Sequence, residues 1–229
     1  MKDINAITYF EGLGEKFDAY MSDYDVEQRK FLVFSQLLKD QELKGAKVLE
    51  VGCGTGRFSE QIVRLGGELT VLDIGPTLVA NVASNLSCSG VVGDACNLPF
   101  AAQSFDVVVS SECIEHTLNP ERAIREMCRV CRAGGLVIMT SPNKLWYPIL
   151  AMAKKLRLRK FSGIENWVFP GKAAAIMLEE GMADVVMGGC HLWPFQLKFT
   201  RFLLRRFDTL GRWLYPIMVN FGIRGRKHT

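Results

Sequence analysis

The stretch "VLEVGCGTGRF", residues 48–58, joins a short apolar run to a loop with three glycines at alternate positions. The apolar run suits a buried strand, because short continuous apolar segments fit a strand that is covered on both faces. Gly52, Gly54 and Gly56 suit a backbone that turns tightly or approaches a bound molecule closely. The stretch therefore predicts a buried strand followed by a ligand-binding loop.

Strand-like and helix-like segments alternate on both sides of this stretch. Expected strands are 46–51, 68–74, 89–95, 104–111 and 136–142, and expected helices are 26–40, a segment ending near residue 65, 76–86 and 119–135. Asn119 can cap the last helix and Gly134-Gly135 can end it. Apolar strands that alternate with helices are typical of a parallel sheet buried on both faces. With right-handed crossovers, we expect a doubly wound α/β fold.

The carboxyl ends of parallel strands lie at one edge of the sheet, and ligands of such folds bind beyond that edge. We therefore expect one cleft, lined by the strand tips at 52–56, 73–75, 94–96 and 110–116.

The residues at these tips distinguish two classes of ligand. A dinucleotide loop has the spacing G-x-G-x-x-G and directs a helix N-terminus at a pyrophosphate, whereas this loop reads G-x-G-x-G. Glu50 precedes the loop by two residues, where a carboxylate favours a cation over a phosphate. Asp73 can accept hydrogen bonds from both hydroxyls of a ribose, and Asp94 can accept one from an adenine amine. The pattern favours a cationic adenosine derivative without phosphate.

Four segments within residues 45–142 resemble the class I S-adenosylmethionine-dependent methyltransferases. They are "VLEVGCGTG", the terminal acid of "LTVLD", "GDACNLPFAAQSFDVVVSSECIEH" and "RVCRAGGLVIMTSPN". The resemblance implies S-adenosylmethionine as the cofactor. It also implies a Rossmann-like sheet of seven strands, mostly parallel, in which the seventh runs antiparallel between the fifth and sixth. The remaining elements would be a helix at 170–181 and strands at 182–190 and 216–227.

The resemblance also assigns the cofactor site. Residues 52–56 would line the methionine and ribose, Asp73 would hold the ribose, Asp94 and Ala95 would meet the adenine, and Ser111 would lie near the amino-acid end. Together with Glu50, the predicted cofactor-binding residues are Glu50, Gly52, Cys53, Gly54, Gly56, Asp73, Ile74, Asp94, Ala95 and Ser111. Two alternatives stay open: a nicotinamide-dependent oxidoreductase, which would also need Asp73, and a binding module that has lost catalysis.

The segment "SECIEHTLNP" carries the candidates for catalysis. If residues 112–116 form a helical turn, Glu112, Glu115 and His116 share one face. This E-x-x-E-H pattern resembles the ubiquinone-biosynthesis O-methyltransferases, in some of which a divalent metal has been proposed at such a set. We predict that His116 deprotonates or positions the methyl acceptor, and the sequence leaves metal binding open. His191 is predicted to be structural.

Composition places the chain among folded proteins of the cytoplasm. Of 229 residues, 48% are hydrophobic and 23% charged, no apolar run is long enough to cross a bilayer, and the N-terminus lacks the apolar core of a signal peptide. Seven cysteines at irregular spacing indicate free thiols. Cys128 and Cys131 form one C-x-x-C, which we interpret as two residues on one helix face.

Charge divides the chain into unequal parts. Residues 1–141 hold 13 Lys and Arg against 19 Asp and Glu, whereas residues 142–229 hold 15 against 5. We predict a single domain with an N-terminal helical lid (1–44), a cofactor-binding core (45–142) and a remainder (143–229) whose basic, aromatic insertions form the acceptor side. In 195–214, phenylalanines recur at helical spacing between cations, which suggests contact with a membrane surface or a lipid-like molecule.

The acceptor class follows from these insertions. A small, apolar or lipid-like molecule, methylated at oxygen, fits them best. A protein acceptor stays an alternative. Nucleic acid fits less well, because the aromatic residues alternate with aliphatic ones instead of forming a stacking platform.

Overall fold

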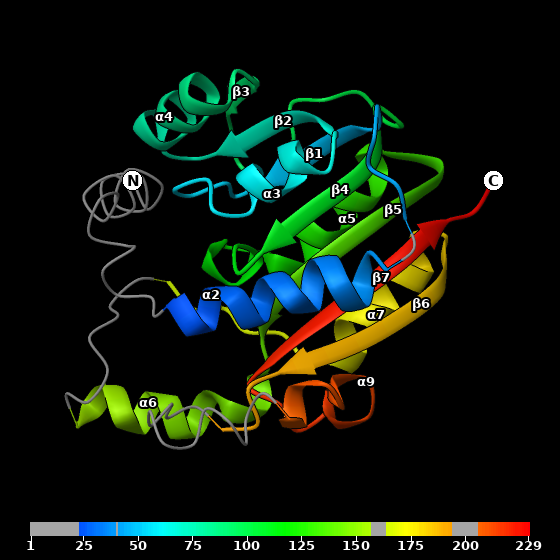
Figure 1. Ribbon diagram of the computed structural model, residues 1–229. Helices are drawn as coiled ribbons and strands as arrows, with labels where there is room; N and C mark the ends of the chain where they lie inside the picture. Colours follow the sequence, from blue (N-terminus) through cyan, green and yellow to red (C-terminus); the bar gives the residue numbers. More distant parts are fainter. Residues whose placement is uncertain (1–22, 40, 157–163, 194–205) are drawn as a thin grey trace.

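A seven-stranded sheet forms the centre of the computed structural model, which describes residues 23–39, 41–156, 164–193 and 206–229 (Figure 1). The strand order is β3-β2-β1-β4-β5-β7-β6, and β7 runs antiparallel between β5 and β6. The predicted topology is thus confirmed. The strands are β1 (Lys47–Val51), β2 (Glu68–Asp73), β3 (Ser89–Val92), β4 (Phe105–Ser111), β5 (Cys131–Pro142), β6 (Met182–Cys190) and β7 (Asn220–Lys227).

Helices cover both faces of the sheet, and each face has its own apolar core. On one face, a core that includes Leu32, Ile62 and Val79 joins the sheet to η1 (Phe31–Leu37), α3 (Ser59–Arg64) and α4 (Pro76–Leu86). On the other, Ile124, Met127 and Ile176 belong to the core under α5 (Pro120–Val130) and α7 (Pro170–Glu179). Figure 1 shows these two layers on opposite sides of the strands. Other helical segments of the described residues include α2 (Asp23–Lys30), η2 (Ile114–His116), η3 (Lys144–Trp146), α6 (Tyr147–Lys155) and α9 (Gly211–Leu214).

The predicted helix over 119–135 ends earlier than expected. Asn119 caps α5 by accepting the Arg122 N–H at 3.0 Å, as predicted, but α5 ends at Val130 and β5 begins at Cys131. Gly135 lies within this strand, where a Cβ would come 2.6 Å from the Asp106 carbonyl oxygen. The two cysteines of the C-x-x-C therefore lie on different elements, and our interpretation of them as one helix face was wrong.

The predicted helix over 26–40 begins at Asp23 and changes its winding. After α2, residues 31–37 have the wider π-helical turn, and Leu32, Val33 and Leu37 are buried against the sheet. Residues 1–22 of the predicted lid lie outside the described residues, as does most of 195–214. Among the helices that are described, none is long and apolar enough to span a bilayer.

Candidate functional site

The glycine loop begins where β1 ends and is held against the tip of β2. The N–H of Gly52 donates to the Leu72 carbonyl at 2.7 Å, and Gly52 and Gly56 have φ of +79° and +88°. A Cβ on Gly52 would lie 2.3 Å from the Cys113 sulfur, so the loop packs directly against the segment that follows β4. Glycine is required at Gly52 for both its backbone conformation and this close approach.

Asp73 ends β2 and fastens the loop through its carboxylate. Its Oδ2 accepts the Gly54 N–H and its Oδ1 accepts the Gly75 N–H, each at 3.0 Å. Burial raises the pKa of Asp73, and these N–H groups oppose the shift. The same carboxylate thus orders the loop and lies at the predicted ribose position.

The other predicted cofactor residues lie on neighbouring tips. Asp94 is exposed after β3, where its Oδ1 accepts the Cys96 N–H at 2.8 Å, while Ala95 is buried and Ile74 is half-buried. Ser111, the last residue of β4, shares a hydrogen bond of 3.0 Å with the Thr140 hydroxyl. The Gly93 N–H bonds the Asp73 carbonyl, and the Ser110 hydroxyl bonds the Val51 carbonyl. The structure therefore brings the predicted tips together.

Glu50 is buried in β1, where the Ser59 hydroxyl donates to its carboxylate. Burial raises the pKa of Glu50 to about 8, and the Ser59 hydroxyl opposes this shift. A nearby cation would favour the ionised form.

The site fits a cationic adenosine ligand. Gly54, with φ of +51°, has open space beside it: a Cβ there would meet nothing within 4 Å. This space adjoins the Asp73 carboxylate through the Gly54 N–H. Backbone N–H groups, an acid at the ribose position and a buried acid suited to a cation are the groups that such a ligand requires.

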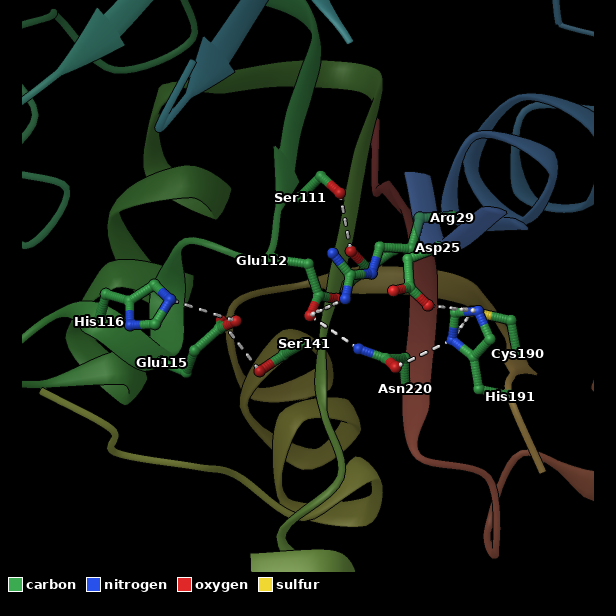
Figure 2. Close-up of polar contacts among 11 residues, drawn as sticks. Asp25, Arg29, Ser111, Glu112, Glu115, His116, Ser141, Cys190, His191 and Asn220 are labelled. Carbon is green, nitrogen blue, oxygen red and sulfur yellow. Dashed lines mark hydrogen bonds and ion pairs between the residues drawn. The ribbon is translucent and has the colours of Figure 1, made fainter. Parts of the chain in front are cut away.

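The segment after β4 differs from its predicted geometry. Residues 114–116 form the short helix η2, but Glu112 has φ of +52° and lies outside it. Glu112 therefore does not belong to the short helix that carries Glu115 and His116, but its carboxylate still lies close to that of Glu115, and burial together with the Glu112 charge raises the pKa of Glu115 (Figure 2). The prediction that the three side chains share one helical face was wrong, because the reversed backbone at Glu112 turns its side chain toward β7.

Glu115 and His116 are adjacent on η2 and contact each other. The Ser141 hydroxyl donates to Glu115 Oε2 at 3.2 Å, and His116 Nε2 lies 3.9 Å from Glu115 Oε1. His116 Nδ1 is 2.9 Å from the Ile164 carbonyl oxygen, which can only accept, so the neutral imidazole carries its proton on Nδ1. Among the residues described, no group of three His, Cys, Asp or Glu side chains converges as a metal site.

Four polar side chains beside Glu112 were not predicted as functional residues. Asn220 Nδ2 donates to Glu112 Oε2 at 2.7 Å, and Arg29 Nη2 lies 3.8 Å from the same oxygen. His191 Nδ1 lies 3.2 Å from Asn220 Oδ1, and His191 Nε2 lies 3.4 Å from Asp25 Oδ1. Figure 2 shows this succession from α2 to the ends of β4, β6 and β7. The spacing of Asp25 and Arg29, four residues apart on one helix, was the available sequence signal.

Comparison with known proteins gives a consistent result. Residues 49–139 match the model of a methyltransferase domain family. The chain is 37% identical over 109 residues to the ubiquinone biosynthesis O-methyltransferase of Xanthomonas euvesicatoria, covering 45% of this chain and 46% of that protein. It is 30% identical over 172 residues to the protein of the same name in Proteus mirabilis, covering 69% of each. The chain thus spans about half the length of the first curated relatives that it matches.

The solved structures agree in fold. A SAM-dependent methyltransferase from Thermotoga maritima superimposes with a TM-score of 0.67 at 20% identity, covering 95% of this chain and 98% of that one.

Proposed function

Since this chain belongs to the S-adenosylmethionine-dependent methyltransferase family, we propose that it transfers the methyl group to an oxygen of a small, apolar or lipid-like acceptor. Membership of this family excludes the nicotinamide-dependent oxidoreductase that the sequence had left open as an alternative. The likeness to the Proteus mirabilis O-methyltransferase, over 69% of both chains, is the observation that carries the oxygen assignment.

The chain's own residues divide this task between two halves of the cleft. The loop 52–56 and Asp73 would hold the cofactor, which supplies a methyl group already activated on a sulfonium. Alignment of the acceptor oxygen with that methyl group provides most of the acceleration, because the transfer is an in-line displacement. A hydroxyl acceptor also has to lose its proton, and the tip of β4 carries the carboxylates and imidazole suited to that. His116 is the predicted positioning group.

Mass spectrometry of products tests the proposal. The purified chain would be incubated with methyl-labelled S-adenosylmethionine and separate lipid and aqueous extracts of the source cells. We expect the label in an apolar product as a methyl ether or ester. Label only on nitrogen, or only on protein, would contradict the oxygen assignment.

We also propose that the region after β5, which the sequence analysis assigns to the acceptor side, contacts an anionic lipid surface. Exposed apolar side chains gather on η3 and α6, where Met152 is 64% and Leu156, just after α6, 62% exposed, and Lys154 and Lys155 are exposed beside them. Each cation near an anionic surface contributes up to about 1 kcal/mol, and salt screens this attraction.

Flotation with liposomes of phosphatidylcholine and phosphatidylserine tests this contact. We expect co-flotation at low salt, weaker binding at high salt, and weaker binding after Lys154→Gln and Lys155→Gln. Absence of co-flotation at low salt would reject it.

A further inference from the structure

The polar side chains beside Glu112 form a chain of contacts that starts and ends on the same helix. From Asp25 it passes through His191, Asn220 and Glu112 to Arg29, with separations of 3.4, 3.2, 2.7 and 3.8 Å (Figure 2). Asp25 and Arg29 lie one turn apart on α2. We name these five residues the α2 ring.

The direction of each hydrogen bond in the α2 ring follows from its neighbours. An ionised Glu112 carboxylate only accepts, so Asn220 must present its amide N–H groups to Glu112 and its Oδ1 to His191. His191 Nδ1 is then the donor. Asn220 and His191 are 4% and 1% exposed, so water does not offer them alternative partners. The amide of Asn220 is therefore held in one orientation, because its Nδ2 donates to Glu112 while its Oδ1 accepts from His191.

These contacts involve only one of the two carboxylate oxygens of Glu112. Oε2 receives Asn220 and faces Arg29, whereas the buried Oε1 has no hydrogen-bond partner among the residues that the structure describes. Burial raises the pKa of Glu112, and Arg29, the Thr140 hydroxyl and Asn220 oppose this shift. A buried acceptor atom without a partner costs about 1–3 kcal/mol. Glu112 also holds a left-handed backbone conformation, with φ of +52°, that a non-glycine residue rarely adopts. Both features, at the strand tip predicted to face the cofactor, are those of a group built to receive a ligand.

We propose that Glu112 is the group that receives the acceptor's proton, and that Asn220 and His191 are positioning residues that hold its carboxylate. This inference rests on the proposed oxygen methylation. The acceptor hydroxyl donates a hydrogen bond to Oε1. As the O–CH₃ bond forms, the S–CH₃ bond breaks with its electron pair returning to sulfur, and the hydroxyl proton passes to Glu112. Charge is conserved, because the sulfonium becomes a neutral thioether while the carboxylate becomes a carboxylic acid.

Isosteric variants separate this assignment from a structural role. Glu112→Gln keeps the size of the side chain and should lower kcat about 10²- to 10³-fold. His191→Asn retains a donor near Nδ1, whereas His191→Leu removes it. We expect His191→Leu to lower kcat about tenfold with KM within threefold of the wild type, and His191→Asn to recover most of the loss. His228→Leu and Glu179→Gln, at exposed positions, are the matched controls.

The probe is dodecyl gallate, which carries phenolic hydroxyls on an apolar chain, used alongside the labelled extract fraction. Binding of the probe to the complex with S-adenosylhomocysteine gives a readout independent of turnover, and Glu112→Gln should weaken it. Unchanged affinity for S-adenosylhomocysteine verifies that each variant is folded.

The outcomes separate the two proposals. If the wild type methylates no hydroxyl, the proposed function fails and this inference fails with it. If the wild type does so but Glu112→Gln keeps kcat within threefold, or His191→Asn is as impaired as His191→Leu while both are folded, only the assignment of Glu112 and its positioning residues is overturned.

Discussion

The predicted cofactor half of the site, at the tips of β1 and β2, and the proposed acceptor half, around the α2 ring, are built from different kinds of chemical group. The cofactor half, at the tips of β1 and β2, relies on backbone N–H groups and on glycines, with Asp73 as the side chain that organises them. The acceptor half relies on side chains from α2, β4, β6 and β7, and the α2 ring joins residues nearly 200 positions apart. Backbone geometry suits an invariant ligand, whereas side chains can be exchanged to suit different acceptors. We expect substitutions in one half to leave the other half's task intact.

The largest effect should come from Gly52→Ala, which strains the backbone of the glycine loop in the cofactor half. A Cβ would lie 2.3 Å from the Cys113 sulfur at a residue with φ of +79°. We expect a loss of about 2–4 kcal/mol in the free energy of unfolding, because strain and overpacking add. Gly45→Ala, with φ of +70° but open space, is the matched control and should cost about 1 kcal/mol. Urea denaturation measures both. Equal losses would mean that the contact with Cys113 does not matter.

His116→Ala tests the acceptor half independently of the cofactor half. Turnover should fall about 10²-fold or more, since a positioned imidazole is lost. Affinity for S-adenosylmethionine should be nearly unchanged, because the described contacts of His116 are with the Ile164 carbonyl and with Glu115. Steady-state kinetics and calorimetry check the two parts. Unchanged turnover on the true acceptor would reduce His116 to a structural residue.

Asp73→Ala tests the cofactor side in the same way. It should weaken binding of S-adenosylmethionine and S-adenosylhomocysteine by roughly 1.5–3 kcal/mol, the range for hydrogen bonds to a charged group. Loss of the anchor for Gly54 and Gly75 adds to the effect. Calorimetry that found binding of NAD but of neither nucleoside would overturn the assignment of the cofactor.

The smallest effect concerns pH. The pKa of Glu50 is raised to about 8, so this carboxyl is protonated in the free protein below that pH. A sulfonium favours the ionised form, and affinity for S-adenosylmethionine should therefore rise with pH, by at most about tenfold per unit, and level off above pH 8. S-adenosylhomocysteine, whose sulfur is neutral, should show less of this rise, and Glu50→Gln should remove the difference. Identical pH profiles for the two ligands in the wild type would contradict a role for Glu50.

The same division explains what the sequence could predict. Strand β1, the glycine loop and Asp73 are contiguous or separated by one helix, so apolar patterns and short motifs locate them. The α2 ring has only the four-residue spacing of Asp25 and Arg29 as a local signal: His191 and Asn220 meet because β7 pairs with β6, and local patterns do not encode that pairing. The reversed backbone at Glu112 and the early end of α5 also depend on tertiary contacts, which override local propensity.

The antiparallel insertion of β7 imposes an order on synthesis. Strand β6 has β7 as its partner within the sheet, and β7 follows it by about thirty residues. While the chain emerges from the ribosome, the outer edge of β5 and all of β6 remain without strand partners until residues 220–227 have left the exit tunnel. An open, apolar edge is a template for pairing with other chains. The nascent protein is therefore exposed to misassociation for longest at β5 and β6, the two strands that β7 later joins.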